Sequence, residues 1–222
     1  MKRSKIKTDS TQELVDMICR ACLVAKDAAF NVGDYIASSS RIAFVAVQQC
    51  EKELDQIERD VDQALPSAIA EVGELQARQL LACLKFITDV ERIGDLLCSV
   101  ANGIHRLTSP LHKEDARHLL EMSATLQTML EDVYKGFVRS DEEPAALVLR
   151  NDAKIDHACH DLFRRHLQLS GDKATSDSTR LLFIAQAFER AGDHAKNLAE
   201  EIIHLVRGHT LKHASRTRLR TD

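Results

Sequence analysis

Apolar residues recur at helical spacing along nearly the whole chain, and no segment alternates between apolar and polar residues as a strand does. This pattern predicts an all-α fold. A proline-marked junction near residue 110 separates a first set of three helices from a second set of three. We expect the six helices at about 10–34, 40–64 or beyond, 74–107, 110–138, 144–169 and 176–207.

Proline and capping signals divide the chain further. The segment Thr108–Pro110 predicts a capped start of the fourth helix with proline in its first position, and Ser140–Pro144 repeats the signal for the fifth. Pro66 falls late in the second helix, which it either kinks or ends. The domains expected are a basic N-terminal tail at 1–9, three-helix bundles at 10–108 and 109–208, and a basic C-terminal tail at 209–222.

Two stretches about a hundred residues apart are near-copies, and each contains Glu-Arg-x-Gly-Asp. Glu91 and Asp95 in the first copy, like Glu189 and Asp193 in the second, are spaced i,i+4, which puts both carboxylates on one helix face. Two like charges at this spacing repel. Because the unfavourable pair occurs twice inside otherwise apolar helices, it needs a counter-charge, and a bound cation is the natural candidate.

The repeat extends to the second helix of each half. Glu51 and Asp55 match Asp152 and Asp156, again at i,i+4. The offset between these pairs is 101 positions, and that between Glu91 and Glu189 is 98. The simplest architecture is therefore two tandem, pseudo-symmetric three-helix bundles, each with acidic pairs on its second and third helices.

If those helices face each other, four carboxylates converge in each bundle. Hard oxygen ligands suit magnesium, calcium, manganese or iron, and bridging carboxylates permit a multinuclear site. Two alternatives remain open. The acids can instead form salt bridges with Arg92, Arg190, Lys154 and Lys196. A carboxylate-bridged iron-storage or di-iron redox protein needs two Glu-x-x-His motifs, and Glu201 with His204 has no partner at the related position of the first half.

Composition narrows the function classes. A net charge of −4 argues against a nucleic-acid-binding domain. The chain lacks a glycine-rich phosphate loop and any recognisable nucleophile motif, so we expect a protein that is not an enzyme. No apolar run approaches the ~18 residues that span a bilayer, and the charged start leads into no signal-like segment. We therefore expect a cytoplasmic protein.

The two copies, at 89–95 and 188–200, resemble the PhoU family of regulators associated with bacterial phosphate-specific transport. The resemblance covers nearly the whole chain and implies that the chain folds as two similar three-helix bundles. We expect two such chains to form a homodimer. The resemblance also implies multinuclear metal clusters, iron first among the candidates, with manganese, magnesium, calcium and zinc left open. The implied partners are the phosphate ABC transporter and a sensor histidine kinase, with membrane contact only through them. The implied role is to restrain phosphate uptake and repress phosphate-starvation genes.

The implied metal ligands are Glu51, Asp55, Glu91, Asp95, Asp152, Asp156, Glu189 and Asp193. The residues expected to support these ligands are Arg92, Arg190, His194 and Asn197. The second copy keeps the family's Gly-Asp-His-Ala-x-Asn, whereas the first has Leu96 and Ser99 in place of His194 and Asn197. Because a ligand is oriented by its polar neighbours, we predict stronger metal binding in the second bundle.

Overall fold

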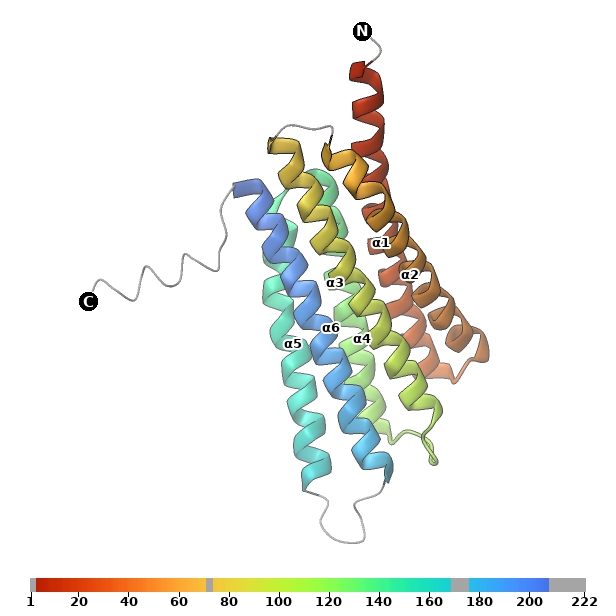
Figure 1. Ribbon diagram of the computed structural model, residues 1–222. Coiled ribbons are helices and arrows are strands. Elements are labelled where there is room, and N and C mark those ends of the chain that lie inside the picture. The colour runs from red at the N-terminus through yellow and green to blue at the C-terminus, as the bar shows by residue number, and fades with distance from the viewer. Residues whose placement is uncertain (1–2, 71–73, 169–175, 208–222) are drawn as a thin grey trace, which may run out of the picture.

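The computed structural model describes residues 3–70, 74–168 and 176–207, and Figure 1 shows its six helices. The C-terminal tail predicted at 209–222 lies outside these residues. The described helices are α1 (Arg3–Ser38), α2 (Arg41–Ala70), α3 (Glu74–His105), α4 (Lys113–Arg139), α5 (Glu142–Leu167) and α6 (Ser176–Arg207).

The helices form two three-helix units that pack side by side. In the first unit α1, α2 and α3 contact one another, and in the second α4 and α6 both contact α5 as well as each other. The units meet where α1 packs on α4 and α3 packs on α6, so α2 and α5 lie on the outside (Figure 1). One continuous hydrophobic core runs through both units. The prediction of two tandem three-helix bundles is confirmed.

Small residues let the two bundles approach closely. A Cβ atom added at Gly103 of α3 would lie 2.7 Å from Cγ1 of Ile184 on α6, so a larger residue would require the Ile184 side chain or one of the helices to shift. At the other contact, the buried Ser123 hydroxyl on α4 donates a hydrogen bond of 2.7 Å to the carbonyl of Ala29 on α1. The bundles are therefore joined by packing as close as that within each bundle.

At the first bundle the predicted start of the first helix is wrong, whereas the second helix continues beyond residue 64, as the prediction allowed. Helix α1 begins at Arg3 and so includes most of the segment predicted as a basic tail, because the residues before Ser10 include no glycine or proline to end it. Helix α2 continues through Pro66 to Ala70. Leu65 and Ala68 are buried on either side of the proline, so their packing holds this turn helical.

The start of α4 also differs from its prediction. The helix begins at Lys113, and its N-cap is His112, whose Nδ1 accepts a hydrogen bond of 3.2 Å from the Glu114 amide. The amide and hydroxyl of Thr108 instead donate to the carboxylate of Asp177 on α6. A distant side chain therefore holds residues 106–112 as a loop, and the boundary predicted between 108 and 109 falls within it.

None of the described helices is long and apolar enough to cross a membrane.

Phe86 provides a test of the shared core. Its side chain is fully buried on α3 and its ring lies 4.7 Å from that of Phe137 on α4, measured between ring centres. We expect Phe86→Ala to lower the free energy of unfolding by about 4 kcal/mol, measured by urea denaturation. The matched control is Phe183→Ala on α6, because Phe183 is 67% exposed. A loss at Phe86 no larger than that at Phe183 would contradict the packing described here.

Candidate metal centre

The glycine of the repeated motif sets the distance between α2 and α3. A Cβ atom at Gly94 would lie 2.5 Å from Cδ1 of the fully buried Leu54, so only glycine allows this approach. Asp95 follows Gly94 along α3, and Asp55 follows Leu54 along α2. The close contact in the core therefore places two carboxylates side by side at its edge.

Three carboxylates converge at this point. Oxygen atoms of Glu51, Asp55 and Asp95 all lie within 4.8 Å of one another, and each side chain is partly exposed. Among the described residues this is the one such group of three potential metal ligands. With Glu91, these residues make up what we call the first acidic cluster. Its geometry fits a hard cation bound by oxygen, because the ligands need only small side-chain movements to share an ion.

Glu91 is the buried member of the first acidic cluster. It is 8% exposed, and its Oε2 accepts no hydrogen bond from the described residues. The nearest positive charge is Arg92, whose Nε lies 3.5 Å away on a mostly exposed side chain. Burial, followed by the charges of Asp95 and Glu58, raises the pKa of Glu91 to about 7. A bound cation would relieve this repulsion, which the mostly exposed Arg92 offsets only in part.

Glu58 is a further carboxylate beside this cluster that the sequence analysis missed. Burial and the charge of Asp62 raise its pKa, and its own charge acts on Glu91. Glu58 lies three residues after Asp55 on the same face of α2, and this spacing could have identified it from the sequence. The repeat did not reveal Glu58, because the residue at the equivalent position of the second half is Cys159, which is not acidic.

The predicted acids of the second bundle are arranged differently. Asp152 is 5% exposed on α5, and its Oδ2 accepts a hydrogen bond of 2.6 Å from Nζ of Lys196 on α6. Burial, and then the charges of Asp152 and Glu189, raise the pKa of Asp156. With Asp193, these three acids form what we call the second acidic cluster. Its four carboxylates influence one another, but no three of them offer ligand atoms as close together as those of the first cluster.

The four residues expected to support the metal ligands do not all contact the acidic clusters. Arg92 pairs with Asp95 at 3.3 Å as well as with Glu91. Arg190 and Asn197 are exposed. His194 points across the contact between the bundles, where its Nδ1 lies 2.7 Å from an oxygen of Asp89 on α3. The histidine therefore contacts the first repeat motif, although its neighbour Asp193 belongs to the second.

The Glu201 and His204 pair lies apart from both acidic clusters. These residues line a cavity of about 1120 Å³ between the bundles, at the end where α3 begins and α6 ends. Glu201 is bound there by Lys85 of α3 at 3.2 Å. The described residues bring no second Glu-x-x-His pair to this place, so the arrangement gives no support to a di-iron site.

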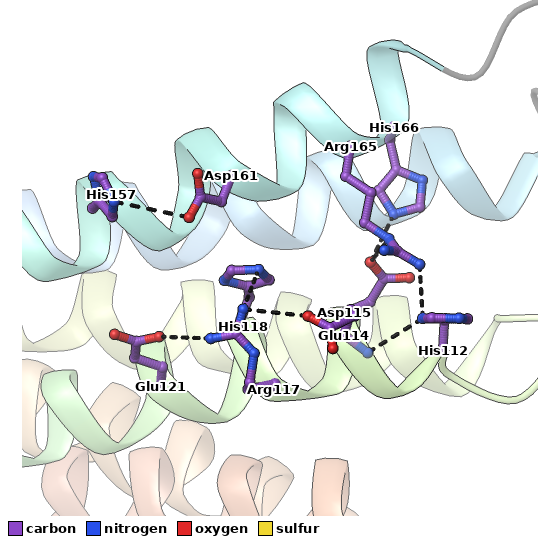
Figure 2. A network of polar contacts seen from close by, with 10 residues as sticks. All are labelled: His112, Glu114, Asp115, Arg117, His118, Glu121, His157, Asp161, Arg165 and His166. Atoms are coloured by element: carbon purple, nitrogen blue, oxygen red, sulfur yellow. Dashed lines mark hydrogen bonds and ion pairs between the residues drawn. The ribbon is translucent and has the colours of Figure 1, made fainter.

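A polar network that the sequence analysis did not find joins α4 to α5 (Figure 2). The Asp115 carboxylate is 2% exposed, and its Oδ1 accepts hydrogen bonds from Nε of Arg165 at 2.9 Å and Nε2 of His166 at 3.1 Å. Arg165 also reaches the capping His112 at 2.7 Å. The network therefore fastens the end of α5 to the start of α4, which is a structural task.

Comparison with known proteins now places the chain. The PhoU domain matches it twice, at residues 18–104 and 119–202, one match in each bundle. The chain belongs to the PhoU family. Two relatives carry the name phosphate-specific transport system accessory protein PhoU homolog. The relative from Burkholderia is 32% identical over 76% of this chain and 75% of its own length. The relative from Pseudomonas aeruginosa is 27% identical over 90% of this chain and 84% of its own length.

Solved PhoU structures have the same fold. The crystal structure of PhoU from Pseudomonas aeruginosa matches with a TM-score of 0.79 at 22% identity, over 91% of this chain and 99% of that one. PhoU from Streptococcus pneumoniae, described as a phosphate transport system regulatory protein, matches with a TM-score of 0.81 at 18% identity, over 92% and 99%. At these identities the likeness shows the fold alone.

The raised pKa of Glu91 predicts a pH-dependent stability. Because the pKa lies above its ordinary value of 4.5, the folded chain holds the proton more tightly than the unfolded one. The contribution of Glu91 to stability therefore falls as the pH rises from about 4.5 to about 7. Glu91→Gln cannot ionise, so relative to wild type it should gain stability between pH 4 and pH 8. Urea denaturation in a chelator measures this, and an equal difference at both pH values would contradict it.

The Asp115 network predicts a stability loss of its own. Asp115→Ala removes a buried carboxylate that pairs with Arg165 and accepts a hydrogen bond from the buried His166, so we expect the free energy of unfolding to fall by about 2 kcal/mol. The control is Asp161→Ala on α5, whose partner Arg164 is mostly exposed and whose loss should stay below about 1 kcal/mol. Thermal denaturation compares them. Equal shifts in Tm would mean that the buried carboxylate contributes no more than a surface ion pair.

Proposed function

We propose that this chain is a non-enzymatic regulator of phosphate uptake and of phosphate-starvation signalling. The observation that carries the proposal is the pair of PhoU-domain matches, which cover the two bundles. Relatives that share up to 32% of its residues over three quarters of its length are named as accessory proteins of phosphate-specific transport. The proposed partners are the phosphate ABC transporter and a sensor histidine kinase, which a cytoplasmic homodimer would contact at the membrane.

We further propose that the first acidic cluster binds the metal. Glu51, Asp55 and Asp95 offer convergent oxygens, and the buried Glu91, whose Oε2 accepts no hydrogen bond from the described residues, adds its charge to theirs. Iron is the first candidate by family resemblance, and the donor set equally suits manganese or magnesium. When bound, the ion supplies positive charge to an otherwise repelling group of carboxylates.

The position of the cluster suggests how metal would affect a partner. The side chains of Asp55 and Asp95 are 36% and 41% exposed, on α2 and α3. Binding a cation would convert this patch from strongly negative to nearly neutral and would fix its side chains. A partner surface would therefore distinguish the metal-bound from the metal-free protein by charge, which acts mainly on encounter rate and specificity.

Metal content of the purified protein tests the site. We expect wild type, prepared without a metal-affinity tag, to retain metal by elemental analysis. The triple variant Glu51→Gln, Asp55→Asn and Asp95→Asn keeps the side-chain shapes and removes the charges, so it should lose that metal. The matched control carries Glu53→Gln, Asp60→Asn and Asp62→Asn on α2. Equal metal content in the two variants would contradict the site.

The regulatory role needs a separate test in the native host. Deletion of the gene should raise expression of phosphate-starvation genes in high phosphate, measured with a transcriptional reporter. The wild-type gene should restore repression, and the triple variant should restore less of it, if the metal-bound surface contacts the partners. Unchanged expression after deletion would contradict a role in phosphate signalling while leaving the metal site untouched.

A further inference from the structure

The two acidic clusters occupy equivalent places in the repeat but differ in what neutralises them. The offset of 98 positions that relates Glu91 to Glu189 also relates Cys98 on α3 to Lys196 on α6. The structure keeps this equivalence. Lys196 interacts electrostatically with Asp152 and Asp193. Cys98 interacts with Glu51 and Asp95, which are the equivalents of those two acids in the first repeat.

Lys196 makes a closer contact than any basic group of the first cluster. Its ammonium lies 2.6 Å from Asp152, which is almost fully buried. In the first cluster Arg59 approaches Asp55 to 3.5 Å and Arg92 approaches Asp95 to 3.3 Å, from side chains more than half exposed. Solvent screens such exposed pairs strongly. The second cluster therefore has a positive charge that is closer to its carboxylate and less exposed, at 40%, than either arginine of the first cluster.

A second difference also makes the second cluster less negative than the first. Glu58 adds a carboxylate beside the first cluster, whereas Cys159 takes its place in the second and donates from Sγ to Oε2 of Glu189 at 3.6 Å. Burial, and then the charge of Glu189, raises the pKa of the Cys159 thiol to about 12, which keeps it a neutral donor. One oxygen of Glu189 is thus occupied by a thiol, and one of Asp152 by an ammonium.

We propose that the ammonium of Lys196 takes the place of the metal ion in the second acidic cluster, so that this chain binds metal only at the first. The inference rests on the proposed function in one respect, namely that the first cluster binds metal. It reverses the order of affinity expected from the motif, because His194 contacts Asp89 and leaves the second cluster without its support. The duplicated scaffold then carries one metal-dependent surface and one that is neutralised permanently.

The test removes the internal charge. Lys196→Met keeps an unbranched side chain only one atom shorter, and its thioether is a poor ligand for Mn²⁺. Equilibrium dialysis against Mn²⁺ should show bound metal rising roughly twofold over wild type, because the second set of carboxylates becomes free to bind. The matched control is Lys154→Met, an exposed lysine of the same bundle on α5, which should leave the stoichiometry unchanged.

A stability measurement guards against a folding defect. Without metal, Lys196→Met should have a lower Tm than wild type, because Asp152 is then buried without its partner. Added Mn²⁺ should raise the Tm of this variant by more than it raises that of wild type. A variant that binds no more Mn²⁺ than wild type, or gains no extra Tm, overturns the inference.

The outcomes separate the two proposals. If wild type binds Mn²⁺ and Lys196→Met adds none, the metal site of the proposed function stands and the role of Lys196 fails. If wild type binds none while the variant binds some, Lys196 does replace a cation, and the assignment of metal to the first cluster fails. Binding by neither protein overturns both. Wild-type binding that is lost on changing Glu189 and Asp193 to Gln and Asn also overturns the inference.

Discussion

Core packing in this protein holds carboxylates together that would otherwise repel each other. Gly94 lets Leu54 approach so closely that Asp55 and Asp95, the next residues along each helix, meet at the edge of the core. Burial of apolar side chains on both helices supplies the free energy that offsets this repulsion. The carboxylates are therefore held close together without a ligand. A cation that binds them would not have to supply the free energy that brings them together.

The two acidic clusters differ in how their negative charge is neutralised. In the second bundle Lys196 reaches from α6 to the buried Asp152, so the chain provides its own cation. In the first bundle the equivalent residue is Cys98, which brings no charge. The two clusters lie in bundles joined along α3 and α6, where Asp89 and His194 meet at 2.7 Å. If the first cluster binds metal as proposed, the duplicated fold keeps one site that responds to metal and one that Lys196 neutralises.

Local sequence signals were sufficient for the fold and for part of the site. Helical periodicity gave six helices, and α6 occupies its predicted range, Ser176 to Arg207. The start of α4 was misplaced because Asp177, far along the chain, binds Thr108. Repetition marked the eight acids as candidate metal ligands, and the structure brings three of them within 4.8 Å of one another. Glu58 was missed because only one half has it, and the direction of His194 depends on a contact between bundles, which no local pattern encodes.

Anomalous X-ray diffraction from crystals soaked in Mn²⁺ tests the central claim most directly, since it locates the ion rather than counting it. We expect an anomalous peak among the carboxylates of Glu51, Asp55 and Asp95. We expect none between Asp152 and Glu189, where the ammonium of Lys196 should remain in contact with Asp152. A peak at the second cluster with Lys196 displaced, and none at the first, would contradict the account.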